Sequence, residues 1–426
     1  MKKRLSKVML VTSFAVLLII ALLVTGCGSN ATQTTPATTP AGTTPTASAP
    51  APEFRIGLMG GQTGPAAAAV INMLTEIGYH FKYINEVEGG INGVKLDWKI
   101  VDDKGTPDGA VLAFKELREG YRPQLYLAVE DYLFAGIKDQ LVEDNAVLLT
   151  TSVVSPQLFS PPGRYFSTAL PWVDEFGAYI NWVKQDWKGT GNPKVGIFYY
   201  DLPSGLVWKA AQPWVAKQNV DLVPVPYPYT SLDFSPQLLQ LRDAGVNYTW
   251  MLGTSVSAPV AIKGMVGLGL KDKIKFTFNQ NSEPDVVLPI AGKDAAGFTF
   301  IRTETPYSDN SEAAQLFTTV WKWAANKDKW SDNRPAMNVR YVIEAIIKQA
   351  AADVGKDKID GAAVYNALNK LTNIDCQGNN QGLKYGPDSR FGTRSVKIVL
   401  VNETGTGTTA MSDFITAPRI AEGIDK

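Results

Sequence analysis

The chain has 426 residues, in which 41 Lys and Arg balance 41 Asp and Glu, with one His and two Cys. A single hydrophobic core stops growing beyond roughly 250–300 residues, so this length predicts at least two domains. With 45% apolar residues the chain is neither disordered nor fibrous. Four bases lie before residue 27, and the other 37 face 41 acids, so we expect no nucleic-acid partner.

The first residues have the order of an export signal. A basic stretch from Lys2 to Lys7 precedes an apolar run over residues 8–24, followed by Thr25, Gly26 and Cys27. This ending resembles a bacterial lipobox, which implies a signal peptide over residues 1–26 and a diacylglycerol anchor on Cys27. The alternative is an uncleaved anchor, because the apolar run is close to the roughly 17–25 residues that span a bilayer. Both interpretations hold the protein outside the cytoplasmic membrane.

Residues 27–52 are rich in Thr, Pro and Ala and carry no charged or aromatic side chain. Such a segment buries too little apolar area to offset its ordering entropy, so we expect a disordered linker. If Cys27 is lipidated, Cys376 is the only other thiol, and no intrachain disulfide is expected. Cys376 has no Cys or His close in sequence, so we expect no metal site there.

The folded body begins near Phe54 with alternating strand and helix patterns. A helix is predicted over residues 66–88, with an apolar stripe that includes Leu74, Ile77 and Phe81. His80 lies off this stripe, so we expect it to face solvent. Strands are predicted over residues 54–59, 96–101, 125–129, 147–149, 195–199, 220–223, 248–252, 275–278, 298–301 and 396–401. Repeated β-α-β units predict two doubly wound parallel sheets, with ligand beyond the carboxyl ends of the strands.

Short motifs in this body carry a family resemblance. Ile56-Gly57-Leu58 precedes Thr63-Gly64-Pro65, and Gly89-Gly90-Ile91-Asn92-Gly93 ends the first long helix ahead of Asp102-Asp103. Further matches lie at residues 149–158, 253 and 290–297. Together these motifs resemble the periplasmic binding proteins that serve leucine, isoleucine and valine uptake.

The resemblance implies an α/β, two-lobed periplasmic binding protein type I fold. Each lobe is then a doubly wound parallel sheet flanked by helices, and three crossover segments form a hinge. Lobe 1 is implied at residues 53–170 and 303–384, and lobe 2 at residues 171–302 and 385–419. The implied partners are a small-molecule solute and an ABC permease, with no cofactor, and we expect a monomer.

The positions that meet an amino-acid ligand in this family are altered here. Glu130, Asp131 and Tyr132 stand where the family has a Ser-rich loop, and Val154 replaces a Thr. Two acids would repel a ligand carboxylate, so we expect a solute other than a branched-chain amino acid. The candidate ligand-binding residues are Gln62, Thr63, Glu130, Asp131, Tyr132, Thr151, Ser152, Trp172, Tyr200, Ser204, Thr254, Ser255 and Gln280.

Structural roles are open alternatives for several of these residues. Glu130 and Asp131 also suit the start of a helix, where acids favour its dipole. Thr63 equally suits a turn, and Trp172 and Tyr200 equally suit a core or hinge.

Catalytic motifs are absent from the sequence. It contains no Gly-x-Ser-x-Gly, His-Glu-x-x-His, phosphate-binding loop or Cys-x-x-Cys, and a Ser–His or Cys–His pair would require His80. We therefore expect no enzyme, but a protein that captures a solute between two lobes and delivers it to a permease. The alternative is a sensory receptor ectodomain that signals by lobe closure; the sequence shows no cytoplasmic output domain, which favours capture.

Overall fold

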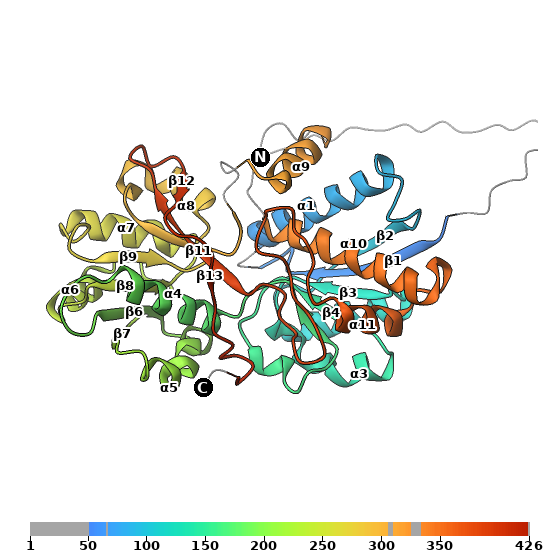
Figure 1. The fold of residues 1–426 in the computed structure, drawn as a ribbon, viewed down its shortest axis with the longest axis horizontal. Coiled ribbons are helices and arrows are strands. Elements are labelled where there is room, and N and C mark those ends of the chain that lie inside the picture. Colours follow the sequence, from blue (N-terminus) through green and yellow to red (C-terminus); the bar gives the residue numbers. More distant parts are fainter. Residues whose placement is uncertain (1–50, 65–66, 306–309, 325–333, 425–426) are drawn as a thin grey trace, which may run out of the picture. The chain divides into compact units, whose positions relative to one another are not determined.

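The computed structural model describes residues 51–64, 67–305, 310–324 and 334–424 (Figure 1). The expected signal peptide, Cys27 and most of the linker lie outside these residues. No helix in the described ranges is long and apolar enough to cross a membrane.

The first sheet has five parallel strands in the order β2-β1-β3-β4-β5. Its strands are β1 (Glu53–Gly60), β2 (Lys95–Asp102), β3 (Leu125–Ala128), β4 (Leu148–Thr150) and β5 (Tyr165–Ser167). The order places β1 in the interior, and its side chains are buried from Ile56 to Gly60. A run buried on both faces is typical of a parallel strand covered by helices on each side.

Two apolar clusters cover the faces of this sheet. One cluster includes side chains from α1 (Ala67–Glu86), α9 (Glu312–Trp323), α10 (Arg334–Val354) and α11 (Gly361–Lys370). The other includes side chains from α2 (Pro107–Glu116) and α3 (Lys138–Glu143). Gly90 follows α1 with φ +94°, and a Cβ there would lie 2.5 Å from the Val94 carbonyl oxygen, so glycine is required.

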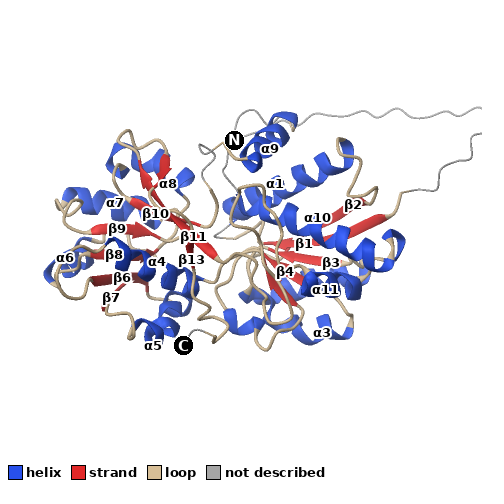
Figure 2. Cartoon of the chain, viewed as in Figure 1, coloured by secondary structure: helices blue, strands red, loops and turns tan. Residues whose placement is uncertain are grey.

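The second sheet has eight strands, in the order β12-β11-β10-β9-β8-β6-β7, with β13 paired to β11 (Figure 2). Its strands are β6 (Lys194–Tyr200), β7 (Asp221–Tyr227), β8 (Tyr248–Leu252), β9 (Lys275–Phe278), β10 (Thr299–Arg302), β11 (Ser395–Val401), β12 (Thr408–Ala410) and β13 (Ile415–Thr416). The helices of this lobe are α4 (Trp172–Asp186), α5 (Gln212–Val215), α6 (Ser235–Asp243), α7 (Ser257–Gly267) and α8 (Pro284–Ala291). One continuous apolar cluster joins these elements.

Segments that pass between the two sheets are bonded to one another. The Thr393 hydroxyl donates to the Thr168 carbonyl at 2.6 Å, and the backbone N–H of Gly392 donates to the Ser167 carbonyl at 2.8 Å. The segment that leaves β5 and the segment that enters β11 therefore run together. Two of the expected crossover segments are therefore hydrogen-bonded side by side.

Most of the predicted elements are confirmed. Each of the ten predicted strands overlaps an observed strand, and the first predicted helix is α1. The second sheet is not purely parallel, because β11 runs antiparallel to both β10 and β12. The short strands β5, β12 and β13 were not predicted, since two or three residues are too few to show a period.

The prediction that His80 faces solvent is wrong. Its side chain is 2% exposed, and its ring centroid lies 6.3 Å from the ring centroid of Phe317 in α9. Burial, and then the charge of Arg340, lower the pKa of His80 to about 3. The helix is covered by α9 and α10 beyond its apolar stripe, and these helices come from more than 200 residues later in the chain.

Candidate functional site

Most of the predicted site residues lie at the carboxyl ends of the parallel strands. Gln62 and Thr63 follow β1, Glu130 to Tyr132 follow β3, Thr151 and Ser152 follow β4, Tyr200 ends β6 ahead of Ser204, Thr254 and Ser255 follow β8, Gln280 follows β9, and Trp172 begins α4. Such ends are where open α/β sheets bind ligands. Burial, Glu130 and Asp131 raise the pKa of Tyr132, and Tyr200 of the other lobe adds to this rise.

A different hollow, of about 740 Å³, lies against the C-terminal half of α4 and residues 411–416. None of the predicted site residues lines it. We place the candidate site at the strand ends, because loops from both sheets converge there with polar and aromatic side chains.

Gln62 and Thr63 form a turn around the carboxylate of Asp102. Oδ1 of Asp102 accepts the backbone N–H of Gln62 at 2.8 Å, and Oδ2 accepts the Thr63 hydroxyl at 2.8 Å. Burial acts to raise the pKa of Asp102, but hydrogen bonds from Thr63, Lys104 and Gln62 outweigh it and lower that pKa. Thr63 thus has the turn role that was its alternative, and it still lies exposed at the edge.

Asp131 is fully buried and holds two loops together. Its carboxylate accepts the backbone N–H of Val154 at 3.1 Å and that of Ser155 at 2.7 Å. It makes no side-chain cap on the helical turn that follows it. Burial raises the pKa of Asp131 to about 6, although these hydrogen bonds lower it. Both carboxylate oxygens are therefore committed to the protein backbone.

Glu130 and Asp103 form an acidic pair that has no basic partner among the described residues. The Tyr132 hydroxyl donates to Oε2 of Glu130 at 3.2 Å. Burial raises the pKa of Glu130, and the charges of Asp103 and Asp131 raise it further. Burial likewise raises the pKa of Asp103, whose Oδ1 accepts the Gly105 N–H at 2.9 Å. Asp103 is 1% exposed, and its Oδ2 has no hydrogen-bond partner among the described residues.

The loop after β4 contributes two hydroxyls. Thr151 donates to the Val129 carbonyl at 3.0 Å, which ties the ends of β3 and β4 together. The Ser152 hydroxyl is buried and has no partner within the described part of the chain.

In the second lobe, tyrosine rings dominate the edge. Tyr200 is buried, shares a hydrogen bond with Ser204, and packs edge-on against Tyr229 with ring centroids 5.3 Å apart. The Thr254 hydroxyl accepts the backbone N–H of Ser257 at 3.2 Å and so closes the turn before α7. Ser255 beside it is partly exposed.

Gln280 lies in the hinge. Its Nε2 donates to the Leu170 carbonyl at 3.2 Å, and its backbone N–H donates to Oε2 of Glu175 at 3.4 Å. Glu175 is fully buried and also accepts Nε1–H of Trp250 at 3.0 Å. Burial raises the pKa of Glu175 to about 8 despite these hydrogen bonds. Trp172, 8% exposed, packs in the core of the same lobe.

Sequence reasoning missed Asp103, Glu175 and the exposed apolar residues at this edge. Asp103 was noted only as part of a family motif, and its burial under the Gly61 and Gly105 turns has no sequence signal. The exposed apolar residues outside the predicted set are Leu202, Tyr229, Leu232 and Val256. A large apolar residue directly after a strand is a usable signal when the strand is already assigned.

Comparison with known proteins gives a family and a fold. The family model described as periplasmic binding protein matches residues 53–406. No curated protein sequence matches the chain. A branched-chain amino acid ABC transporter protein from Thermus thermophilus, solved with bound valine, is similar, with TM-score 0.76, 15% identity and coverage of 88% of this chain and 99% of that chain.

Two further solved structures are titled with other ligands. A fatty acid ABC transporter substrate-binding protein from Thermomonospora curvata has TM-score 0.71 and 15% identity, covering 88% of this chain and 95% of that chain. A solute-binding protein from R. palustris in complex with 4-hydroxybenzoate has TM-score 0.68 and 17% identity, covering 86% of this chain and 98% of that chain. At these identities the likeness establishes the type I two-lobed fold.

Proposed function

Because the chain belongs to the periplasmic binding protein family, we propose that it captures a small solute between its two lobes and delivers it to an ABC permease. The observation that carries this proposal is that the candidate site residues of both lobes follow the carboxyl ends of their parallel strands. The similar structures of ABC transporter proteins from Thermus thermophilus and Thermomonospora curvata support it. In this role the protein releases its solute unchanged.

Capture follows from hinge closure. The solute docks on the loops of one lobe, and the other lobe then closes on it. Only contacts that the solute makes better in the closed state shift the equilibrium toward closure. The paired crossovers at Thr168 and Thr393, and Gln280 beside them, are the elements about which this closure turns.

The solute in this proposal is not a branched-chain amino acid. The family's Thr at the β4 loop is Val154, which has no hydroxyl. Asp131 accepts the N–H groups of Val154 and Ser155, so these donors are not available to a ligand carboxylate. Glu130 beside them repels an anion. The amino-acid clamp therefore lacks the hydroxyl at position 154, and the N–H groups of Val154 and Ser155 are already taken by Asp131.

The location that we propose is the outer side of the cytoplasmic membrane, with a lipid on Cys27. The order of residues 2–27 supports this anchor, and family membership supports an extracytoplasmic protein. We propose lobe borders at residues 53–170 with 303–384, and 171–302 with 385–419. The separate apolar clusters of the two sheets support a division into two lobes, although Tyr385 and Phe391 pack in the clusters of the first sheet and Leu170 in that of the second.

A metabolite screen tests the capture function. The full chain, purified in mild detergent, is screened by thermal shift against cationic, neutral and anionic small molecules, and each hit is measured by calorimetry. We expect at least one solute to bind at micromolar or lower Kd and to reduce the radius of gyration in small-angle scattering. If no compound stabilises the protein, or if a saturating solute leaves the radius unchanged, the proposal is wrong.

A further inference from the structure

Among the described residues, no base pairs with the acidic pair of Glu130 and Asp103 at the end of the first sheet. Asp103 follows β2 and Glu130 follows β3, the two strands that flank β1. Besides burial, the charges of Asp103 and Asp131 raise the pKa of Glu130, and the charge of Asp102 raises the pKa of Asp103. Lys104 is the single base in residues 102–105 and 129–132, and its side chain is exposed. Burying a carboxylate without a cationic partner or full hydrogen bonding is costly.

One carboxylate oxygen of this pair lacks a hydrogen-bond donor among the described residues. Oδ2 of Asp103 is inaccessible to solvent and has no donor among the described residues, although Oδ1 is bonded to the Gly105 N–H. The only side chain that donates to Glu130 in the described structure is Tyr132. A ligand that donates N–H groups to Glu130 and carries a positive charge would offset the negative charge of both carboxylates. An anion or an apolar group would leave them unsatisfied.

The other side of the site is apolar and aromatic. Tyr132 is 43% exposed, and in the second lobe Leu202, Tyr229 and Val256, which follow β6, β7 and β8, are 42%, 49% and 75% exposed. Large apolar side chains gathered beyond strand ends, beside polar groups, are typical of a ligand site. Tyrosine faces also attract a cation through the quadrupole of the ring.

From this juxtaposition we infer that the solute is an organic cation with an aromatic or other apolar body. Its positive group lies against Glu130, where it also offsets the charge of the buried Asp103, and its body lies against Tyr132 and the exposed apolar residues after β6, β7 and β8. This inference deepens the proposed capture function and rests on it. A bare metal ion fits less well, because the described residues contain no group of three His, Cys, Asp or Glu placed to hold one.

A set of charge-matched probes tests the inference. Phenethylamine, 2-phenylethanol and phenylacetate share a ring and differ in charge, and their Kd values are measured by calorimetry on the full chain at low and high salt. We expect phenethylamine to bind at least about tenfold more tightly than 2-phenylethanol, because one charge-assisted contact is worth about a decade or more. Phenylacetate should bind most weakly, and salt should reduce the preference for the amine.

Matched variants locate the effect. Glu130→Gln keeps the size of the side chain and should remove the preference for the amine, whereas Glu403→Gln, an exposed acid in the loop before β12, should retain it. Circular dichroism and Tm confirm that both variants are folded. The inference is overturned if the alcohol or the carboxylate binds as tightly as the amine, if no probe binds, or if Glu130→Gln keeps the preference. In each of these cases the capture function still stands when the metabolite screen finds another solute.

Discussion

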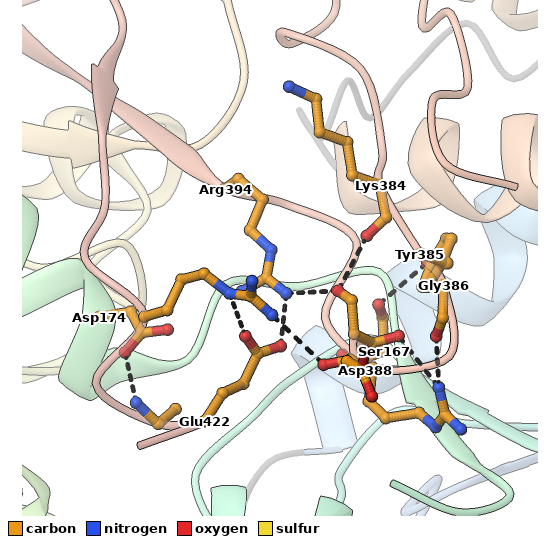
Figure 3. A network of polar contacts seen from close by, with 12 residues as sticks. Ser167, Asp174, Lys384, Tyr385, Gly386, Asp388, Arg394 and Glu422 are labelled. Carbon is orange, nitrogen blue, oxygen red and sulfur yellow. Dashed lines mark hydrogen bonds and ion pairs between the residues drawn. The ribbon is translucent and has the colours of Figure 1, made fainter. Parts of the chain in front are cut away.

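The backbone N–H of Ala421 donates a 2.8 Å hydrogen bond to Oδ1 of Asp174, which fastens the C-terminal segment to the first turn of α4 (Figure 3). Ala421 also packs against the apolar clusters of both lobes. Glu422, next along the chain, is bonded to Arg394 and to Arg419. The segment is therefore a clasp across the lobes beside the hinge.

We expect Glu422→Gln to weaken this clasp. The change removes a charge that two arginines share at a site where the Glu422 side chain is 10% exposed, so the free energy of unfolding should fall by about 1.5–3 kcal/mol. Urea unfolding followed by circular dichroism measures it. Glu403→Gln, on an exposed loop, should change stability by less than about 0.5 kcal/mol. Equal midpoints for the two variants would contradict the role of Glu422.

The hinge acid Glu175 should make stability depend on pH. Its pKa is raised from 4.5 to about 8 in the folded protein, so the folded state holds the proton more tightly than the unfolded state. The stability that this proton contributes is complete below about pH 4.5 and is lost as pH rises through 8.

Comparison with Glu175→Gln isolates this effect. Glutamine keeps an oxygen that accepts Nε1–H of Trp250 but does not titrate, so the difference in unfolding free energy between variant and wild type should grow in favour of the variant from pH 5 to pH 8. Asp131 and Asp174 shift in the same direction and cancel in the difference. A difference that does not change with pH would show that Glu175 titrates normally.

Leucine should bind poorly. A carboxylate that loses two charge-assisted hydrogen bonds, each worth about 1.5–3 kcal/mol, loses roughly 10²–10⁴-fold in affinity. Val154 and the N–H groups taken by Asp131 account for this loss. Calorimetry with leucine, isoleucine and valine is the direct measurement. Binding of any of them at micromolar Kd or tighter would refute the claim about the solute and leave the fold unaffected.

Membrane attachment should depend on Cys27. A Cys27→Ser form should carry no lipid and should leave the membrane fraction, because the acyl chains attach to the Cys27 sulfur. Mass spectrometry of the wild-type protein should show a lipid on Cys27, and Cys376→Ser, at a buried thiol, should keep it. An unlipidated wild-type protein that stays membrane-bound at full length would identify the segment as an anchor.

Elements with a local cause were predictable from the sequence. The strands after Phe54 appear as apolar runs between turn residues, and the turn at Gly89 and Gly90 requires positive φ, which glycine supplies. These signals lie within about ten neighbouring residues. The family resemblance selected Glu130 and Tyr132, and the general rule that ligands bind beyond the carboxyl ends of parallel strands predicts where they lie without knowledge of any contact.

Contacts between distant segments were decided only by the tertiary structure. His80 is buried because α9 covers α1, and Arg340 pairs with Glu88 across 252 residues. Asp131 accepts backbone N–H groups of the β4 loop, whereas Glu130, one residue earlier, has no basic partner in the part of the chain that the structure describes. Neighbouring side chains after a strand point in different directions. Asp131 therefore holds two loops together, whereas Glu130 is a candidate ligand contact. The sequence determined which residues follow the strand ends at the candidate site. The packing of the loops determined which polar atoms of these residues remain available for hydrogen bonds to a ligand.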